Sequence, residues 1–170
     1  THEMWRASHA GTTIVAYAGK VVVKGSSPQR TMALLRDTGG RVHVYFDGAC
    51  RGNPGPASVG YVIVSGDGIV AEGGHTIGRA TNNQAEYEAL VAALEVAVDT
   101  GADEVIIRGD SQLVARQVRG EWNTNDPDLR ELRVTVHELL TNFSDWSIEH
   151  IPREINDRAD QLATNALDEN

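Results

Sequence analysis

Two aspartates stand where apolar, strand-like stretches stop. Asp47 directly follows VHVYF and precedes GACRGNPGP, whose glycines let the backbone come close to a ligand. Asp110 directly follows EVIIRG. Ordinary structure also explains each of them, Asp47 as the aspartate of a turn and Asp110 as the N-cap of a helix. If both strands belong to one sheet, however, the two carboxylates can meet at its edge.

Two further acids lie at or beside the apolar faces of expected helices. Glu86 precedes Leu90 by four residues, which places it on the apolar stripe of its helix. Asp160 adjoins the apolar face of the last helix, where it could also be an ordinary charge at the helix edge. Glu86 could instead be a first-turn acid that favours the helix dipole. Thr81 and Gln84 form a capping-box pattern, but this pattern does not explain the face on which Glu86 lies.

Carboxylates brought within a few ångströms repel one another unless they hold protons or a cation neutralises them. Hard oxygen ligands suit Mg²⁺ or Mn²⁺, and a site with several carboxylates can hold two ions about 3.5–4 Å apart. Such a pair of ions serves phosphoryl transfer. The four acids therefore predict a divalent-metal site that acts on a phosphate.

Hydrophobic periodicity predicts the elements that bring these acids together. An N-terminal β-hairpin and a short helix precede a turn-rich boundary at residues 37–40, and one mixed sheet with helices on its faces follows. The hairpin strands are expected at residues 12–17 and 20–23, and the short helix at 29–36. The sheet strands are expected at residues 42–46, 59–65, 69–76, 104–108 and 146–151. Helices are expected at residues 82–99, 110–120, 126–140 and 155–167.

Composition limits the class of protein. The 170 residues suit one α/β domain plus an extension. A formal net charge of −9 and a pI near 5.0 argue against binding of nucleic acid through overall basicity. The single cysteine, Cys50, excludes an internal disulfide and favours the cytoplasm. No apolar run approaches the roughly 20 residues of a membrane span, so we expect no membrane association.

Four motifs make the chain similar to type 1 ribonucleases H: DGACRGNPGP, TNNQAEYEAL, IIRGDSQLV and HIPREINDRADQLA, in that order. The resemblance extends from Val42 to Leu167. It implies a ribonuclease H fold and a monomeric endonuclease that cuts the RNA strand of RNA–DNA hybrids by two-metal-ion catalysis. The implied products carry 5′-phosphate and 3′-hydroxyl ends. The alternative is a non-catalytic hybrid-binding module of the same fold.

The resemblance also implies roles for single residues. Asp47, Glu86, Asp110 and Asp160 would bind Mg²⁺ or Mn²⁺. His150 would help to move protons or to release product, although a histidine at the edge of the core is an equally good explanation. The implied substrate contacts, to the RNA 2′-hydroxyls and to DNA phosphates, are Gly48, Cys50, Arg51, Gly52, Asn53, Thr81, Asn82, Asn83 and Gln112.

The chain departs from the family in the segment GEWNTNDPDL, which lacks the lysines that members often carry after the turn at its start. We therefore expect weaker binding of the hybrid. Residues 1–40 lie outside the match, and we expect them to be an accessory extension, similar to a truncated substrate-binding element. Lysine occurs only at Lys20 and Lys24, against 24 acids. A lysine-poor acidic chain resembles proteins of salt-loving archaea, and an ordinary acidic mesophilic enzyme is the alternative.

Overall fold

The computed structural model describes residues 3–9, 12–17, 20–25, 40–66 and 68–169. Its centre is a five-stranded sheet in the order β6-β5-β4-β7-β8. β4 pairs antiparallel with β5 and parallel with β7, which pairs parallel with β8, and β5 pairs antiparallel with β6. The strands are β4 (Arg41–Cys50), β5 (Gly55–Ser65), β6 (Gly68–Ala80), β7 (Glu104–Gly109) and β8 (Asp145–His150).

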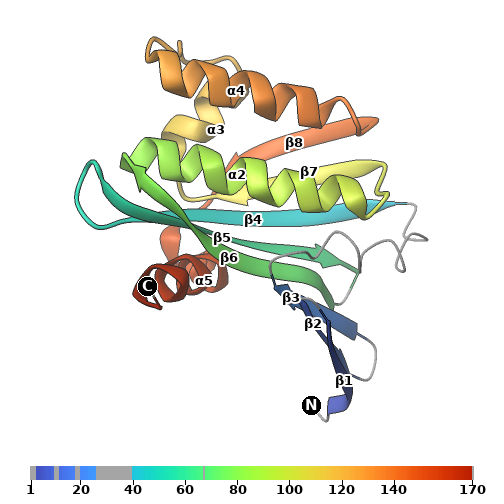
Figure 1. Ribbon diagram of the computed structural model, residues 1–170. Helices are drawn as coiled ribbons and strands as arrows, with labels where there is room; N and C mark the ends of the chain where they lie inside the picture. Colours follow the sequence, from blue (N-terminus) through green and yellow to red (C-terminus); the bar gives the residue numbers. More distant parts are fainter. Residues whose placement is uncertain (1–2, 10–11, 18–19, 26–39, 67, 170) are drawn as a thin grey trace.

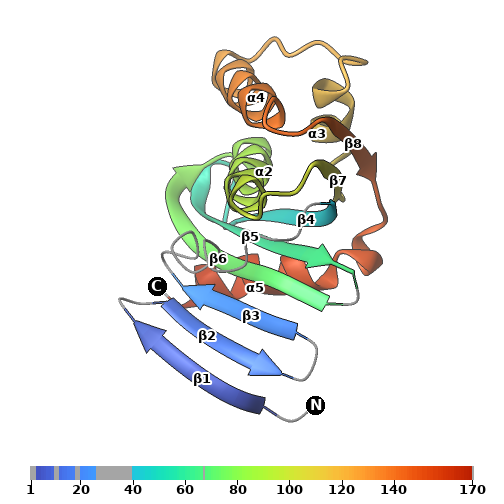
Figure 2. The same cartoon turned by 90° about the vertical axis from the view of Figure 1, so that its right-hand side faces the viewer.

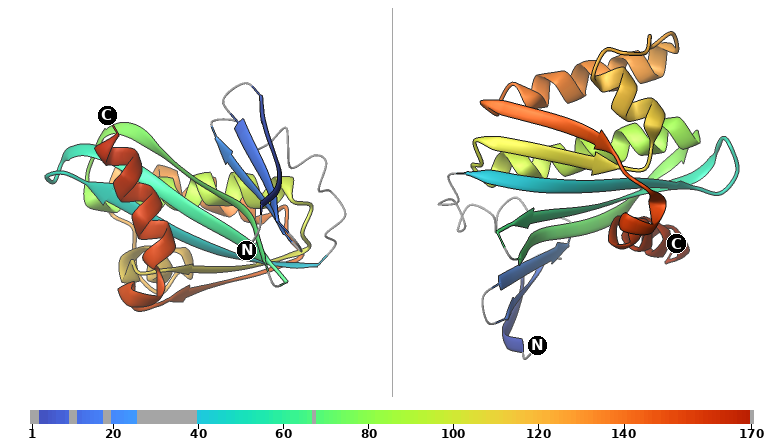
Figure 3. Two further views of the ribbon diagram at one scale, coloured as in Figure 1. Left: turned by 90° about the horizontal axis from the view of Figure 1, so that it is seen from below. Right: turned by 180° about the vertical axis from the view of Figure 1, so that it is seen from behind.

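Helices cover both faces of this sheet, as the sequence predicted (Figure 1). α2, α3 and α4 lie on one face, and α5 crosses the other, as the view from below shows (Figure 3). Their bounds are α2 (Asn82–Asp99), α3 (Gln112–Val118), α4 (Pro127–Leu140) and α5 (Asp157–Asp168), with a 3₁₀ turn, η1 (Arg153–Ile155), before α5.

Alternation along β4 decides which face each side chain joins. Val42, Val44 and Phe46 are buried in the main core, which includes the apolar residues of α2. The intervening His43 and Tyr45 are only partly buried on the other face. Because successive strand residues point to opposite faces, the same alternation sends Asp47 away from α2's core and toward the α5 side.

α5 lies in a trough made by two glycines. Asp47, Gly60 and Gly74 pair in register across β4, β5 and β6. A Cβ on Gly60 would lie 2.3 Å from the carbonyl oxygen of Ala159, and one on Gly74 would lie 2.6 Å from that of Leu162. Both glycines therefore let the helix backbone approach the sheet beside Asp47, closer than any other residue would allow.

The N-terminal residues form a separate three-stranded antiparallel sheet, β1-β2-β3. Its strands are β1 (Glu3–His9), β2 (Thr12–Tyr17) and β3 (Lys20–Gly25), and β3 lies beside β6 (Figure 2). The predicted hairpin is confirmed, whereas β1 was not predicted. The predicted helix over residues 29–36 and most of the boundary at 37–40 lie outside the described residues.

Two predicted strands are longer than expected, since β5 begins at Gly55 instead of residue 59 and β6 ends at Ala80 instead of residue 76. Three further predictions, nearer the acids, are also wrong in detail. β4 does not stop before Asp47, because its pairing with β5 continues to Cys50 opposite Ala57. Asp110 is not the N-cap of α3, because Ser111 holds that position and its Oγ accepts a 3.3 Å hydrogen bond from the N–H of Val114. The last helix begins at Asp157, because η1 precedes it. In the part of the chain described here, no helix is both long and apolar enough to cross a membrane.

Candidate metal and substrate site

Asp47 and Asp110 meet because the parallel ladder between β4 and β7 ends just before them. Its last pair is Phe46 opposite Gly109, and each aspartate is the next residue along its strand. His150 is the partner of Gly109 on β8, so the same end of the sheet also presents this side chain. The sheet topology therefore brings Asp47, Asp110 and His150 together, although Asp47 and His150 are more than 100 residues apart in the sequence.

Glu86 reaches this edge from α2. It lies in the second turn, and the first turn of α2 contains no acid, so the helix-dipole explanation is wrong. Thr81 and Gln84 do form the predicted capping box, which fixes where the helix begins. Burial of the helix stripe then turns Glu86 toward β4, where its carboxylate accepts a 3.3 Å hydrogen bond from the backbone N–H of Gly48.

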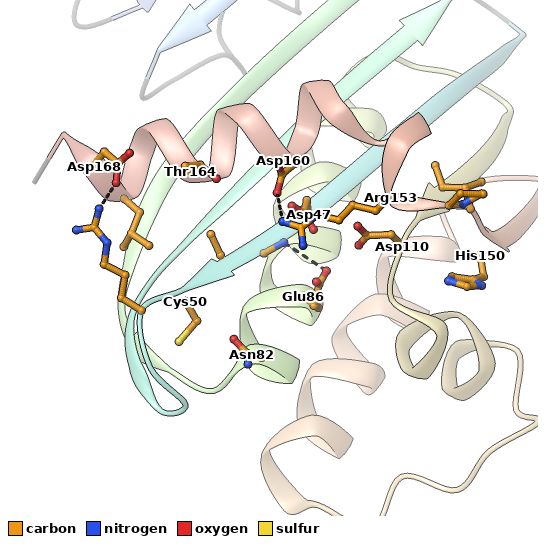
Figure 4. Close-up of a pocket in the computed structure, with 16 residues that line it drawn as sticks. Asp47, Cys50, Asn82, Glu86, Asp110, His150, Arg153, Asp160, Thr164 and Asp168 are labelled. Carbon is orange, nitrogen blue, oxygen red and sulfur yellow. Dashed lines mark hydrogen bonds and ion pairs between the residues drawn. The ribbon is translucent and has the colours of Figure 1, made fainter.

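Carboxylate oxygens of Asp47, Glu86 and Asp110 all lie within 4.8 Å of one another. Asp160 points into the same pocket from α5, outside this group of three (Figure 4). Its carboxylate accepts a 3.1 Å hydrogen bond from Arg153. The four predicted acids thus converge from within β4, from the residue directly after β7 and from two helices.

Burial and mutual repulsion shift the pKa values of two of these acids, Asp47 and Glu86, upward. Burial, followed by the charges of Glu86 and Asp110 and a hydrogen bond with Asp160, raises the pKa of Asp47 to about 10. Burial and the charge of Asp110 raise the pKa of Glu86 to about 8. Asp47 is only 5% exposed. A divalent cation would relieve both desolvation and repulsion, and an all-oxygen donor set fits a hard ion.

A pocket of about 660 Å³ opens over the cluster. Its lining contains nine of the predicted site residues: Asp47, Gly48, Cys50, Arg51, Asn82, Glu86, Asp110, His150 and Asp160. Five predicted substrate contacts do not line it: Gly52, Asn53, Thr81, Asn83 and Gln112. Asn53 still lies next to it, because its side-chain oxygen accepts a 3.1 Å hydrogen bond from the N–H of Asn82.

His150 and Cys50 occupy the pocket rim in different ways. His150 is exposed at the end of β8, so the explanation as a core-edge histidine does not hold. The sulfur of Cys50 lies 2.6 Å from the carbonyl oxygen of Gly52 and 3.1 Å from that of Ala80, and its single hydrogen is shared between these acceptors. These contacts give Cys50 a local structural role between the β4–β5 loop and the end of β6.

Sequence reasoning missed part of the pocket wall. Arg153, Thr164, Leu167 and Asp168 line it from η1 and α5, and Asp168 forms an ion pair with Arg51 across it (Figure 4). The spacing of Thr164, Leu167 and Asp168 from Asp160, at four, seven and eight residues, was the available signal. They share one face of α5 with the predicted metal ligand.

Asn156 holds the start of α5 against the strand that carries Asp47. It is 1% exposed, and its side-chain amide donates a 2.9 Å hydrogen bond to the carbonyl oxygen of Phe46. Asn156 occupies the N-cap position of α5, but it makes no capping hydrogen bond through its side chain. It ties two elements of the site together instead.

Comparison with known proteins gives consistent matches. A family model described as reverse transcriptase-like matches residues 45–166. The ribonuclease HI of Halobacterium salinarum is 64% identical over 170 residues, 99% of this chain and 85% of the relative. A crystal structure of ribonuclease H1 from this halophilic archaeon matches with a TM-score of 0.75 and 70% identity, over 77% of this chain and 100% of that one.

A second solved structure, LC11-RNase H1 in complex with an RNA/DNA hybrid, matches with a TM-score of 0.71 and 40% identity. The match covers 75% of this chain and 97% of that chain. The acidic, lysine-poor composition also agrees with the halophilic source of the Halobacterium relative.

Proposed function

Because this chain belongs to the ribonuclease H family and is an enzyme of that family, we propose that it hydrolyses the RNA strand of RNA–DNA hybrids. The observation that carries the proposal is the group of three carboxylates within 4.8 Å on the floor of an open pocket. The solved relative that holds an RNA/DNA hybrid supports the choice of substrate. The products would carry 5′-phosphate and 3′-hydroxyl ends.

Asp47, Glu86, Asp110 and Asp160 would hold two Mg²⁺ or Mn²⁺ ions, with Asp47 shared between them. When bound, such ions lower the pKa of a water for attack on the phosphate and stabilise the departing oxygen. The chain's own contribution is to keep several acids preorganised around one point, so that no rearrangement is needed when the phosphate arrives. Asp47 is held by its buried position, and Glu86 is held by the hydrogen bond from the N–H of Gly48.

The rim residues would orient the hybrid and handle protons. His150, exposed on the opposite side of the pocket from Cys50, would accept or donate a proton during turnover or product release (Figure 4). Asn53, Asn82 and Gln112, with the backbone at Gly48 and Cys50–Gly52, would contact RNA 2′-hydroxyls, the group that separates RNA from DNA. Thr81 and Asn83 would contact phosphates of the DNA strand. These contacts address sugar and phosphate, so sequence preference should be low.

The direct test uses a labelled RNA–DNA hybrid beside a DNA duplex and an RNA duplex, with Mg²⁺, with Mn²⁺ and with chelator. We expect cutting of the RNA strand of the hybrid with either ion and none with chelator. Mapping of the ends would check the 5′-phosphate. A protein that binds the hybrid but leaves the RNA intact with both ions would instead be the non-catalytic hybrid-binding module.

We further propose that residues 1–40 are an accessory extension and residues 41–170 the catalytic domain. The break in sheet order supports this division, because β1-β2-β3 and the five-stranded sheet are separate. We also propose a monomer in the cytoplasm with the hybrid as partner, and the single free cysteine fits that compartment.

A further inference from the structure

An ion pair on the far flank of α5 has no part in the proposed chemistry. The guanidinium of Arg158, on α5, donates two hydrogen bonds to Glu72 on β6, from Nε at 2.9 Å and from the terminal nitrogen at 2.8 Å. Glu72 has a side chain that is only 3% exposed. A buried carboxylate is rare, and the charge of Glu72 is stabilised by two hydrogen bonds from one guanidinium, which also fix the orientation of both side chains.

The position of Arg158 on α5 relates this pair to the metal site. Successive residues of an α-helix are about 100° apart, so Arg158 and Asp160 are on opposite flanks, with Ala159 between them. Ala159 faces β5 at the Gly60 contact, Arg158 reaches β6, and Asp160 points toward Asp47 on β4. One helix turn therefore spans the three strands, with a charged group at each side.

Small residues at the centre of this contact provide no long side chain that would lock the roll of the helix. Ala159 and Ala163 meet Gly60, and the carbonyl oxygen of Ala163 accepts a 2.6 Å hydrogen bond from the Oγ of Ser58. These contacts lie close to the line where helix and sheet touch, so they oppose rotation less than a contact on the flank of the helix does. An atom roughly 5–6 Å from the helix axis moves by about 2 Å when the helix rolls by about 20°. A misplacement of about 1 Å in a catalytic group can lower a rate about 10²-fold. The roll angle therefore matters for Asp160.

We propose that Glu72 is a positioning residue for the metal site: by holding Arg158, it sets the roll of α5 and so the place of Asp160. The inference rests on the proposed function, in which Asp160 binds metal. Arg153 also contacts Asp160, at 3.1 Å, but it is 75% exposed and belongs to η1, directly before α5. This contact therefore does not connect α5 to the sheet. The bond from Asn156 to Phe46 fixes the start of the helix, and the Arg158–Glu72 pair fixes its flank.

The test compares Glu72→Gln, Arg158→Lys and the control Glu104→Gln in the full chain. Glu104 accepts a 2.8 Å hydrogen bond from Arg41 at the other end of the sheet, so its loss removes a similar ion pair away from α5. Calorimetric titration with Mn²⁺ measures metal affinity without turnover. We expect Glu72→Gln and Arg158→Lys to bind Mn²⁺ about 10-fold more weakly than the parent, which is the effect typical of residues that orient a metal ligand. Glu104→Gln should bind Mn²⁺ as the parent does.

The decisive measurement is a double-mutant cycle with Asp160→Asn. If Glu72 acts through Asp160, Glu72→Gln should weaken Mn²⁺ binding in the parent but add little in the Asp160→Asn background. The kcat for hybrid cleavage should follow the same pattern, with KM changed less than twofold. Equal effects in both backgrounds, or parent-like Mn²⁺ affinity in folded Glu72→Gln and Arg158→Lys, would overturn the proposal. If Glu72→Gln does not fold, Arg158→Lys carries the cycle, since Arg158 is 43% exposed.

The same titration separates this inference from the proposed function. A parent protein that binds Mn²⁺ but cuts no hybrid would contradict the proposed nuclease activity, while the role of Glu72 would still be judged by the Mn²⁺ affinity of Glu72→Gln and Arg158→Lys. A parent that cuts hybrid, with both variants binding Mn²⁺ and turning over as the parent does, would contradict only the positioning role of Glu72.

Discussion

The carboxylate of Glu86 accepts its hydrogen bond from the N–H of Gly48, the residue directly after Asp47. This bond couples α2 to β4 at the point where the acids converge. The two backbones are so close that a Cβ on Gly48 would lie 2.4 Å from the carbonyl carbon of Ala85 and 2.5 Å from the nitrogen of Glu86. No side chain at position 48 fits without moving the helix, and a moved helix carries Glu86 away from Asp47.

Gly48→Ala should therefore lower hybrid cleavage at least ~10²-fold, because real Cβ atoms do not approach backbone so closely and a misplacement of about 1 Å is already costly in a catalytic site. Metal affinity should fall with it, measured by titration with Mn²⁺. Gly66→Ala is the control, since a Cβ there meets nothing within 4 Å, although its φ of +57° strains an alanine. It should lose about 1 kcal/mol of stability and keep its activity.

Asp110→Asn tests the metal-site assignment with almost no change in shape. Asp110 supplies one of the three carboxylates within 4.8 Å. We expect at least a ~10²-fold loss of kcat, as typically follows removal of one preorganised electrostatic group. Asp103→Asn is the matched control, because Asp103 is exposed at the opposite end of the sheet. If Asp110→Asn cuts hybrid as fast as Asp103→Asn, Asp110 is not a metal ligand.

The sequence predicted the acids and most of the elements because both depend on short-range pattern. The apolar stripe around Glu86 and the strand before Asp47 define faces that local periodicity reveals. The helix at Asn82–Asp99 has the predicted bounds, since the cap at Thr81 is a local signal. The assignment of all four acids to one site came from the resemblance in motif order.

What the sequence did not predict depends on long-range pairing. β4 continues through Asp47 because β5 pairs with it to Cys50, and nothing in VHVYFDGAC marks that continuation. The bidentate contact of Arg158 with Glu72 joins residues 86 positions apart, and none of the four sequence motifs contains both of them. Arg51 and Asp168 meet over a still longer separation. Only the packing of α5 on the sheet brings these partners together.

The pH dependence of stability follows from the raised pKa values of Asp47 and Glu86. In the metal-free protein both pKa values lie above those of unfolded acids, near 4, so between that pH and about 8 to 10 the folded state holds more protons. Stability from these groups is therefore present at low pH and lost as pH rises through the folded-state values. Thermal melts with chelator should show a midpoint that falls from pH 5 to pH 9.

Asp47→Asn is the control for this dependence, because it removes the titrating group whose pKa is raised to about 10. Its midpoint should fall less over the same range and should exceed that of the parent at pH 8 in chelator. Mn²⁺ should raise the parent midpoint more at pH 8 than at pH 6, because it competes with protons for the carboxylates. A parent midpoint that rises with pH in chelator would contradict the raised pKa values.

Removal of residues 1–39 tests the proposed extension. The cut should keep Gly40, whose carbonyl oxygen accepts hydrogen bonds from the N–H groups of Asp103, at 2.8 Å, and Glu104, at 3.1 Å, at the start of the main sheet. We expect a folded nuclease with an unchanged metal requirement and an altered KM for hybrid. Circular dichroism and a Mn²⁺ titration report folding independently of activity. An unfolded product would mean that the N-terminal sheet belongs to the core.

Salt dependence follows from the charge of the whole chain. The formal net charge is −9, and several ion pairs are well exposed, such as Arg116 with Glu121, whose side chains are 38% and 44% exposed. Exposed pairs of this kind contribute little and are screened by salt. Salt also screens the repulsion among the 24 acids, because the screening length shortens from about 30 Å at 0.01 M to about 3 Å at 1 M. Repulsion among the excess acids outweighs the attraction within the exposed ion pairs, so screening should favour the folded state.

Thermal melts in dilute buffer and in molar KCl should therefore show a midpoint that rises with salt. Sucrose at equal osmolality is the control, because it stabilises by exclusion from the surface without screening charge. Hybrid affinity should fall less over this range than the roughly 10³–10⁵-fold expected of a protein that makes 6–10 phosphate contacts through basic side chains. Arg51 is already paired with Asp168, and the predicted asparagine contacts carry no charge to be screened. A midpoint that stays constant or falls in KCl would identify an ordinary acidic enzyme, and the nuclease assignment would be unaffected.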